Sequence, residues 1–213
     1  MCLEDFLQVP HEMDEHASHF PLMDNLPALM AAFAYWNVNK VDVSSFCFLP
    51  YDERLRTMVD WLQQLEMESL GKSISTSGKP VVGKTSLPVW GGHGNESQHS
   101  FFQWLREGTS RNAIDVCWCK TPGHLHKELN KVLMSNVNAQ IEVLIMRNAN
   151  SMYFNVLSTL TLDNLEPETL GALMALYEHK TTMLGTLLDI NPFDQPGVEL
   201  GKILAKKVIE ETI

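Results

Sequence analysis

Two polar side chains near the end of one amphipathic segment have the types and spacing needed for acid–base chemistry. Gln64 and Glu68 lie four residues apart, so a helix would place them on one face, near its last turn. The negative end of the helix dipole disfavours an ionised carboxylate there, which makes Glu68 a stronger base. A stronger base suits proton abstraction from carbon. A solvated helix end is the simpler alternative.

A glycine-rich loop between an expected strand and an expected helix is the second candidate. Gly91, Gly92 and Gly94 would let backbone N–H groups approach an anion, and His99 follows near the start of the helix. The positive end of the helix dipole favours a neutral imidazole, which exchanges protons near neutral pH. The alternative is an ordinary turn with a packed histidine.

The stretch NPFDQPGVELGK near the end of the chain is the third candidate. Pro196 suits the first turn of a helix, and Glu199 and Lys202 would then be neighbours on its surface. Lys202 would point back toward Gln195 at the helix start, where the two could meet an oxygen-rich ligand. A plain surface ion pair between Glu199 and Lys202 is the alternative.

Two cysteines and two histidines form a fourth candidate. Cys117 and Cys119 share one face of an expected strand, and His124 and His126 follow shortly after. Two thiols and two imidazoles match the ligands of tetrahedral zinc, but the spacing differs from the common zinc-binding motifs. Alternate cysteines on a buried strand more often only fill space, so we expect no metal site here.

Short apolar runs alternate with helical patterns along the chain and position these candidates. This alternation indicates βαβ units and a mostly parallel sheet covered on both faces, which is an α/β three-layer αβα sandwich of the flavodoxin/Rossmann-like type. Ligands bind beyond the carboxyl ends of such strands, so the loops after residues 51, 92 and 122 should line one rim. Expected strands are residues 44–51, 87–92, 113–119 and 152–160; expected helices are residues 25–39, which should be buried on most sides, 52–71, 97–108, 125–146 and 167–190.

The composition limits the class of protein. A chain of 213 residues with 45% hydrophobic residues is most simply one domain with a substantial core. Its formal net charge of -10 argues against nucleic acid and anionic membranes as partners. No apolar run is long enough to span a membrane, and the N-terminal stretch is acidic rather than signal-like. We therefore expect a cytoplasmic protein whose four cysteines are reduced.

Several motifs together resemble the glucose-6-phosphate isomerase family. FDQPGVELGK matches all fixed positions of the C-terminal signature of that family. LPYDERL, MESLGK, VWGG followed by QHSFFQ, NAQIEVL and ALMALYEHK occur in the family's order with similar separations. The resemblance begins at about Phe20 and implies a sugar-isomerase (SIS-like) domain over residues 25–213, preceded by an N-terminal arm of residues 1–24.

The resemblance also implies an activity and roles for particular residues. The family interconverts glucose 6-phosphate and fructose 6-phosphate through a cis-enediol, a step of glycolysis and gluconeogenesis, without a metal or organic cofactor. By matched motif, Glu68 is the base that shuttles the proton, and His99 and Lys202 assist ring opening. Gln64 and Gln195 contact the sugar phosphate. In the family, the histidine that matches His99 enters the active site from the other subunit of a homodimer.

The chain also departs from the family pattern. GGHGNESQHS replaces the usual Gly-Thr-Asn-Gly-Gln-His run with Asn95, Glu96 and Ser97, and Asn130 stands where a histidine is expected. Family members are far longer, and no counterpart of their N-terminal half, with its phosphate pocket and Gly-Gly-Arg motif, is present. We therefore expect a C-terminal domain that alone has little or no activity. The alternative is a non-catalytic module for dimerisation or partner binding, with a decayed sugar-phosphate site.

Overall fold

Four parallel strands form the centre of the molecule. The computed structural model describes residues 3–123, 126–146 and 152–212. The strand order is β2-β1-β3-β4, and all three neighbouring pairs are parallel. Parallel neighbours need crossover connections, and helices supply them. The strands are β1 (Ser45–Pro50), β2 (Val89–Gly91), β3 (Asn112–Cys119) and β4 (Val156–Leu162).

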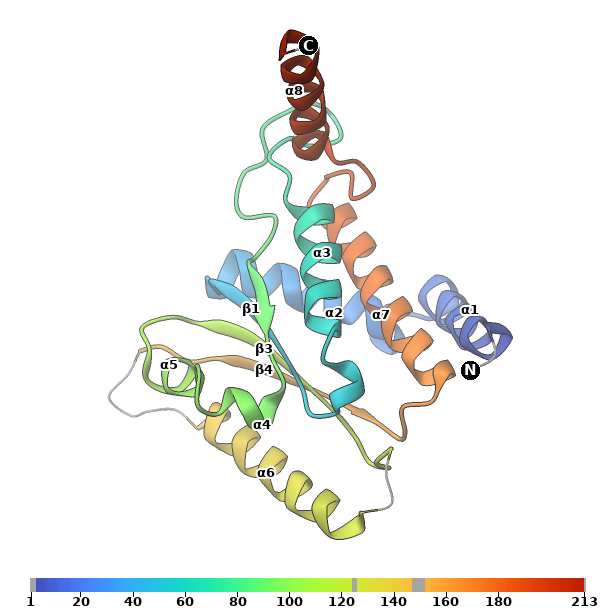
Figure 1. Ribbon diagram of the computed structural model, residues 1–213, viewed down its shortest axis with the longest axis vertical. Coiled ribbons are helices and arrows are strands. Elements are labelled where there is room, and N and C mark those ends of the chain that lie inside the picture. Colours follow the sequence, from blue (N-terminus) through green and yellow to red (C-terminus); the bar gives the residue numbers. More distant parts are fainter. Residues whose placement is uncertain (1–2, 124–125, 147–151, 213) are drawn as a thin grey trace.

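Helices cover both faces of this sheet, as Figure 1 shows. One face carries α2, α3 and α7, with α1 packed along α7 outside them, and the other carries α5 and α6. This arrangement confirms the expected three-layer α/β fold. The helices are α1 (Leu3–His19), α2 (Leu26–Trp36), α3 (Met58–Leu70), α4 (Gly94–Ser97), α5 (Phe102–Glu107), α6 (Lys127–Ile145), α7 (Pro167–Leu187) and α8 (Pro196–Thr212), with short helical turns η1 (Leu22–Asp24), η2 (Asn37–Val41) and η3 (Glu53–Leu55).

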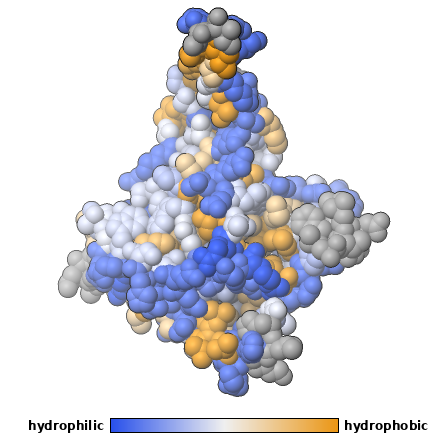
Figure 2. Space-filling model, in the orientation of Figure 1, coloured by the Kyte–Doolittle hydropathy of each residue, from blue (hydrophilic) through white to orange (hydrophobic). Residues whose placement is uncertain are grey.

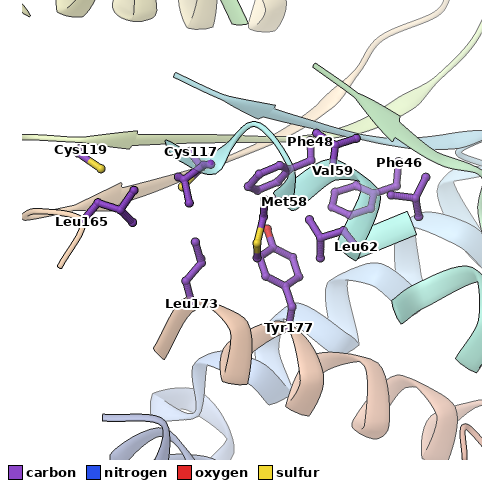
Figure 3. Packing of buried hydrophobic residues seen from close by; sticks show 12 residues of the cluster. Phe46, Phe48, Met58, Val59, Leu62, Cys117, Cys119, Leu165, Leu173 and Tyr177 are labelled. Atoms are coloured by element: carbon purple, nitrogen blue, oxygen red, sulfur yellow. The ribbon is translucent and has the colours of Figure 1, made fainter. Parts of the chain in front are cut away.

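The two core layers follow from the alternation of side chains along each strand. Phe46 and Phe48 of β1 point toward α3 and α7, where Tyr177 packs edge-on against Phe48 at 5.9 Å between ring centroids (Figure 3). Cys47 and Leu49 point to the opposite face, toward α5 and α6. All six residues of β1 are buried, as expected for a central strand of a parallel sheet.

A buried ion pair joins α3 to α7 beneath the sheet. The ammonium of Lys180 lies 2.6 Å from a carboxylate oxygen of Glu66, and both side chains are less than a tenth exposed. The same ammonium lies 4.4 Å from the centre of the Phe46 ring. Nearby, the hydroxyl of Tyr177 donates to Asp115 at 2.7 Å, and burial raises the pKa of this carboxyl. These contacts fix the rotation of α3 about its axis.

Three sequence-based predictions about the helices differ from the structure. Helix α2 was expected to be buried on most sides, but Phe33 and Trp36 are more than half exposed. The expected helix over residues 52–71 begins only at Met58, after the turn η3. The helix expected over 97–108 is divided into α4 and α5, with His99 in the turn between them. The division into an arm (1–24) and a domain (25–213) stays a prediction.

Helix α8 extends away from the rest of the molecule (Figure 1). Its residues 196–211 are all exposed, including six apolar side chains: Val198, Leu200, Ile203, Leu204, Val208 and Ile209. Figure 2 shows this apolar surface on the projecting helix at the top of the molecule. Within the part of the chain that the structure describes, no helix has the length and apolarity to cross a bilayer.

Candidate functional site

A cavity of about 410 Å³ lies where the end of α3 meets the segment that follows α7. We call it the α3 cavity. Because α3 runs back from the end of β1, this cavity lies toward the amino edge of the sheet. Three of the five predicted site residues, Gln64, Glu68 and Gln195, border it, and the rest of its lining is Trp61, Leu65, Ser69, Pro192 and Phe193.

The pattern of α3 explains why Gln64 and Glu68 face this cavity. The buried residues of the helix, among them Leu62, Glu66 and Leu70, form its other side. Gln64 and Glu68 therefore lie on the outward side, and the amide of Gln64 donates to Glu68 Oε2 at 3.4 Å. The side chain of Glu68 is thus accessible and accepts one long hydrogen bond from Gln64, as the spacing of four residues predicted.

Lys72 makes contacts beside the α3 cavity that the sequence did not predict. Its ammonium donates to the backbone carbonyls of Glu68 at 2.7 Å and Ser69 at 3.0 Å, and it lies 3.5 Å from a carboxylate oxygen of Asp194. A cation that bonds the last carbonyls of a helix stabilises its negative end. Lys72 therefore connects the end of α3 to the segment that carries Gln195. The available signal was a lysine two residues after the last residue of a helix.

Lys202 does not border the α3 cavity. It lies on the exposed α8, where its ammonium contacts Glu199 at 2.8 Å, so the plain surface ion pair is the observed arrangement. The hydrogen bond and charge of Glu199 raise the pKa of Lys202, and the charge of Glu68 contributes in the same direction. Lys202 is thus within electrostatic reach of Glu68. Its predicted pairing with Gln195 is not formed.

His99 lies apart from the α3 cavity. It is exposed, in the turn between α4 and α5, and those helices contact α6 on the other face of the sheet from α3. The loop is held by residues that are distant in sequence. The guanidinium of Arg56 bonds both oxygens of Glu96 at 2.7 and 3.0 Å, and Gln140 donates to Gln98 at 3.3 Å. One chain therefore does not bring His99 together with Glu68.

Two of the loop glycines are required by packing. Gly91 has φ of 156°, and a Cβ at this position would lie 2.0 Å from the carbonyl oxygen of Phe48. A Cβ at Gly94 would lie 2.1 Å from the ring of Tyr51. Both contacts are far inside van der Waals distance, so only glycine fits. Close packing thus accounts for these glycines without an anion.

The candidate zinc ligands Cys117, Cys119 and His126 form no metal-ligating group among the residues the structure describes. Cys117 and Cys119 are buried free thiols, and burial raises the pKa of both, that of Cys119 to about 12. His124 lies outside the described residues. Within 3–123, 126–146 and 152–212, one group of three metal-ligating side chains occurs, Glu53, His93 and Glu96, with ligand atoms within 4.8 Å of one another. Arg56 already bonds both of these carboxylates.

These features define an α/β sheet domain with a carboxylate and two amides gathered at one polar cavity. The chain belongs to the phosphoglucose isomerase family, because the model of that family matches residues 2–213. It is 41% identical over 225 residues to glucose-6-phosphate isomerase 2 of Chromohalobacter salexigens and 40% identical over 218 residues to the enzyme of Deinococcus radiodurans. These alignments cover 95% and 93% of this chain.

Solved structures give the same relationship. A crystal structure of a glucose-6-phosphate isomerase from Chlamydia trachomatis has a TM-score of 0.88 and 35% identity, and the match covers 98% of this chain. A hypothetical protein from Thermus thermophilus has a TM-score of 0.78 and 29% identity. The chain spans 40% of the length of both curated relatives and 43% of the Chlamydia chain. The shared part is thus under half of a relative.

Proposed function

We propose that this chain supplies the proton-transfer part of an enzyme that interconverts glucose 6-phosphate and fructose 6-phosphate. The observation that carries the proposal is the α3 cavity, because it gathers Gln64, Glu68 and Gln195 from segments more than a hundred residues apart. A volume of about 410 Å³ is enough for a hexose phosphate. The family relationship independently favours the same substrate.

In the proposed reaction, Lys202 and His99 open the sugar ring by moving a proton between the ring oxygen and the anomeric hydroxyl. Glu68 then removes the proton from C2 of the open-chain aldose while the C1 carbonyl oxygen takes up a proton, which gives a cis-enediol. It returns a proton to C1 while the C2 hydroxyl releases its proton, which forms the ketose. Gln64 and Gln195 bind hydroxyl or phosphate oxygens. The proposed steps use no metal or organic cofactor, as the family resemblance implies.

The proposal includes a second subunit and a second polypeptide region. His99 lies on the opposite face of the sheet from α3, so it would serve the α3 cavity of a partner subunit in a homodimer.

The α3 cavity is bordered by no lysine, arginine or histidine, so the substrate phosphate would be held by the region that the relatives have and this chain does not match. Without that contact, substrate binding cannot position C1 and C2 against Glu68. We expect this chain alone to be inactive or very weak.

Two observations bear on where and how the chain works. Cys47, Cys117 and Cys119 are free thiols inside the fold, which favours a reducing compartment such as the cytosol. The exposed apolar side of α8 favours association with another polypeptide. The same surface would also suit the alternative function, a partner-binding module with a decayed sugar-phosphate site, so activity must decide between the two.

The deciding experiment is a coupled assay for glucose 6-phosphate formation from fructose 6-phosphate. It is run on this chain alone and on this chain mixed with the unmatched part of the Chromohalobacter relative. We expect activity to appear on mixing and to fall about a thousandfold or more with Glu68→Gln, because the base is lost. Glu142→Gln is the matched control, since Glu142 is an exposed glutamate near the end of another helix, α6.

Two outcomes would overturn the proposal. If this chain binds the added part of the Chromohalobacter relative but the mixture shows no turnover, the chain is a binding module. If turnover appears and Glu68→Gln retains it, the base has been assigned wrongly.

A further inference from the structure

A second cavity lies at the opposite, carboxyl edge of the sheet. We call it the edge cavity. Its volume is about 370 Å³, and it shares no lining residue with the α3 cavity. Loops that follow three strands border it, as the sequence predicted for this rim: Tyr51, Asp52, Glu53 and Arg54 after β1, His93 and Asn95 after β2, and Pro122 and Gly123 after β3, together with Cys119 at the end of β3 and Leu129, Asn130 and Leu133 from α6.

The topology of the sheet makes this a favoured place for a ligand. From β1 the chain crosses to β2 on one side and then returns to β3 on the other. The loops after β1 and β3 therefore lead in opposite directions and leave a crevice between them. In open α/β sheets ligands bind in a crevice of this kind, outside the carboxyl ends of the strands.

Polar atoms without partners occur in the lining of the edge cavity. Among the residues the structure describes, four buried side-chain atoms have no hydrogen-bond partner, and two of them are Nδ1 of His93 and Oδ1 of Asn95. An unpaired buried polar atom is unfavourable, because it has lost its hydrogen bonds to water without gaining a partner in the protein. Both side chains border the cavity, so a small rotation would offer these atoms to a ligand. Asn130 brings a further amide from the facing helix.

The charges around the edge cavity disfavour an anion. Arg54 is its only lysine or arginine, and this guanidinium is already used: it bonds Asp52 at 2.7 and 2.9 Å and the carbonyl of Leu165 at 3.1 Å. Glu53 adds a carboxylate whose partner is Arg56. A phosphate would meet two carboxylates and no free cation. The Cys119 thiol, with its pKa raised to about 12 by burial, stays neutral and unreactive.

One wall of the edge cavity is apolar. Leu129 and Leu133 are four residues apart on α6 and so share a face, and Leu129 is 63% exposed. The ring of Tyr51 adds a further apolar surface to the lining. A flat ligand with one C–H-rich face and hydroxyl groups at its rim would cover this wall and satisfy the amides and the imidazole.

We propose that the edge cavity is a second binding site, for an uncharged, hydroxyl-rich ring such as an unphosphorylated sugar. Two of its polar residues, Asn95 and Asn130, are positions where the sequence departs from the pattern it resembles, so this crevice has its own specificity. The site does not depend on the proposed isomerase activity, because the two cavities lie at opposite edges of the sheet.

The test is a titration of the full chain with D-glucose, followed residue by residue in amide NMR spectra, with glucose 6-phosphate as the charged counterpart. D-glucose should shift the signals of residues 51–54, 93–95 and 129–133 in a saturable way, with a Kd of about 1–10 mM for a ligand of this size. Glucose 6-phosphate should shift these signals more weakly, and any shift at Gln64, Glu68 and Gln195 reports the α3 cavity separately.

Two variants and a matched control make the result decisive. Asn130→Ala should weaken D-glucose binding about tenfold by removing one buried hydrogen bond, whereas Asn138→Ala changes an exposed asparagine of the same helix and should leave binding unchanged. His93→Phe should also weaken binding. The proposal is wrong if no saturable shift appears, if both asparagine variants behave alike, or if glucose 6-phosphate binds the edge cavity as tightly as D-glucose.

Discussion

The buried pair of Lys180 and Glu66 gives the most direct test of how the fold holds α3, the helix that carries Glu68. Glu66 lies two residues before Glu68, so its contact with α7 fixes the direction in which Glu68 points. In Lys180→Met, the carboxylate of Glu66 loses a partner 2.6 Å away while staying more than nine-tenths buried. Removing one partner of such a pair costs about 3–5 kcal/mol, because the remaining charge is uncompensated.

The assay is urea and thermal unfolding of Lys180→Met, Glu66→Leu and the double variant. For a chain of this length, a loss of that size lowers the Tm by roughly 10 °C. The double variant should recover most of the stability, since no charge is then buried alone and Leu fits among the apolar neighbours.

A matched control separates burial from ion pairing as such. Lys131 and Glu128 form a pair at 2.9 Å on α6, but both side chains are more than 70% exposed. Lys131→Met should change the free energy of unfolding by less than about 0.5 kcal/mol. If Lys180→Met costs no more than Lys131→Met, or if the double variant is no more stable than the single ones, the reasoning about buried charge is refuted.

Three further predictions concern the loop, the end of α3 and the buried thiols. Gly94→Ala should lower the free energy of unfolding by about 2 kcal/mol or more, since its Cβ would overlap the Tyr51 ring; a wild-type Tm would contradict this. Lys72→Met should speed hydrogen exchange of the last turn of α3 while leaving its first turn unchanged, and Lys72→Arg should restore protection. Burial raises the pKa of Cys119 from 9.0 to about 12, so the stability that this thiol contributes is complete below pH 9 and is lost as the pH rises toward 12. Unfolding at pH 10 should show about 1 kcal/mol of this loss, and Cys119→Ser should lack it; equal slopes for both proteins would refute the assignment.

The sheet could be predicted from the sequence because its strands are short apolar runs between turn signals. Residues 44–51 and 113–119 predict β1 and β3 to within about a residue at each end, since a strand buried on both faces has no competing pattern. The bounds of the helices were harder to predict where tertiary contacts determine them. The break between α4 and α5 depends on Gly94 lying under Tyr51 and on Gln98 bonding Gln140, and neither contact can be read from local propensity.

Some features of the candidate site could likewise be predicted from sequence spacing, and others depend on the tertiary structure. The spacing of Gln64 and Glu68 predicted that they share an accessible helix face, and the structure places both at the α3 cavity. Gln195 joins them there only because the segment after α7 returns to the end of α3. The contact of Lys72 with Asp194 likewise depends on this return path, and sequence spacing gives no information about it. The pairing of Lys202 with Glu199, by contrast, follows from their spacing of three residues on one helix.

The strand order has a consequence for how the chain reaches this structure. β1 precedes the other three strands in the sequence and is buried along its whole length, yet Ser45 bonds Asn112, its partner in β3, across 67 residues. At about 5–20 residues per second, a ribosome needs several seconds to supply that partner. Throughout this interval the apolar strand lacks its neighbour β3, and for most of it the other neighbour, β2, is also missing. Folding of this chain should therefore be slow and governed by long-range pairing, and its yield in cells should rise with chaperone capacity.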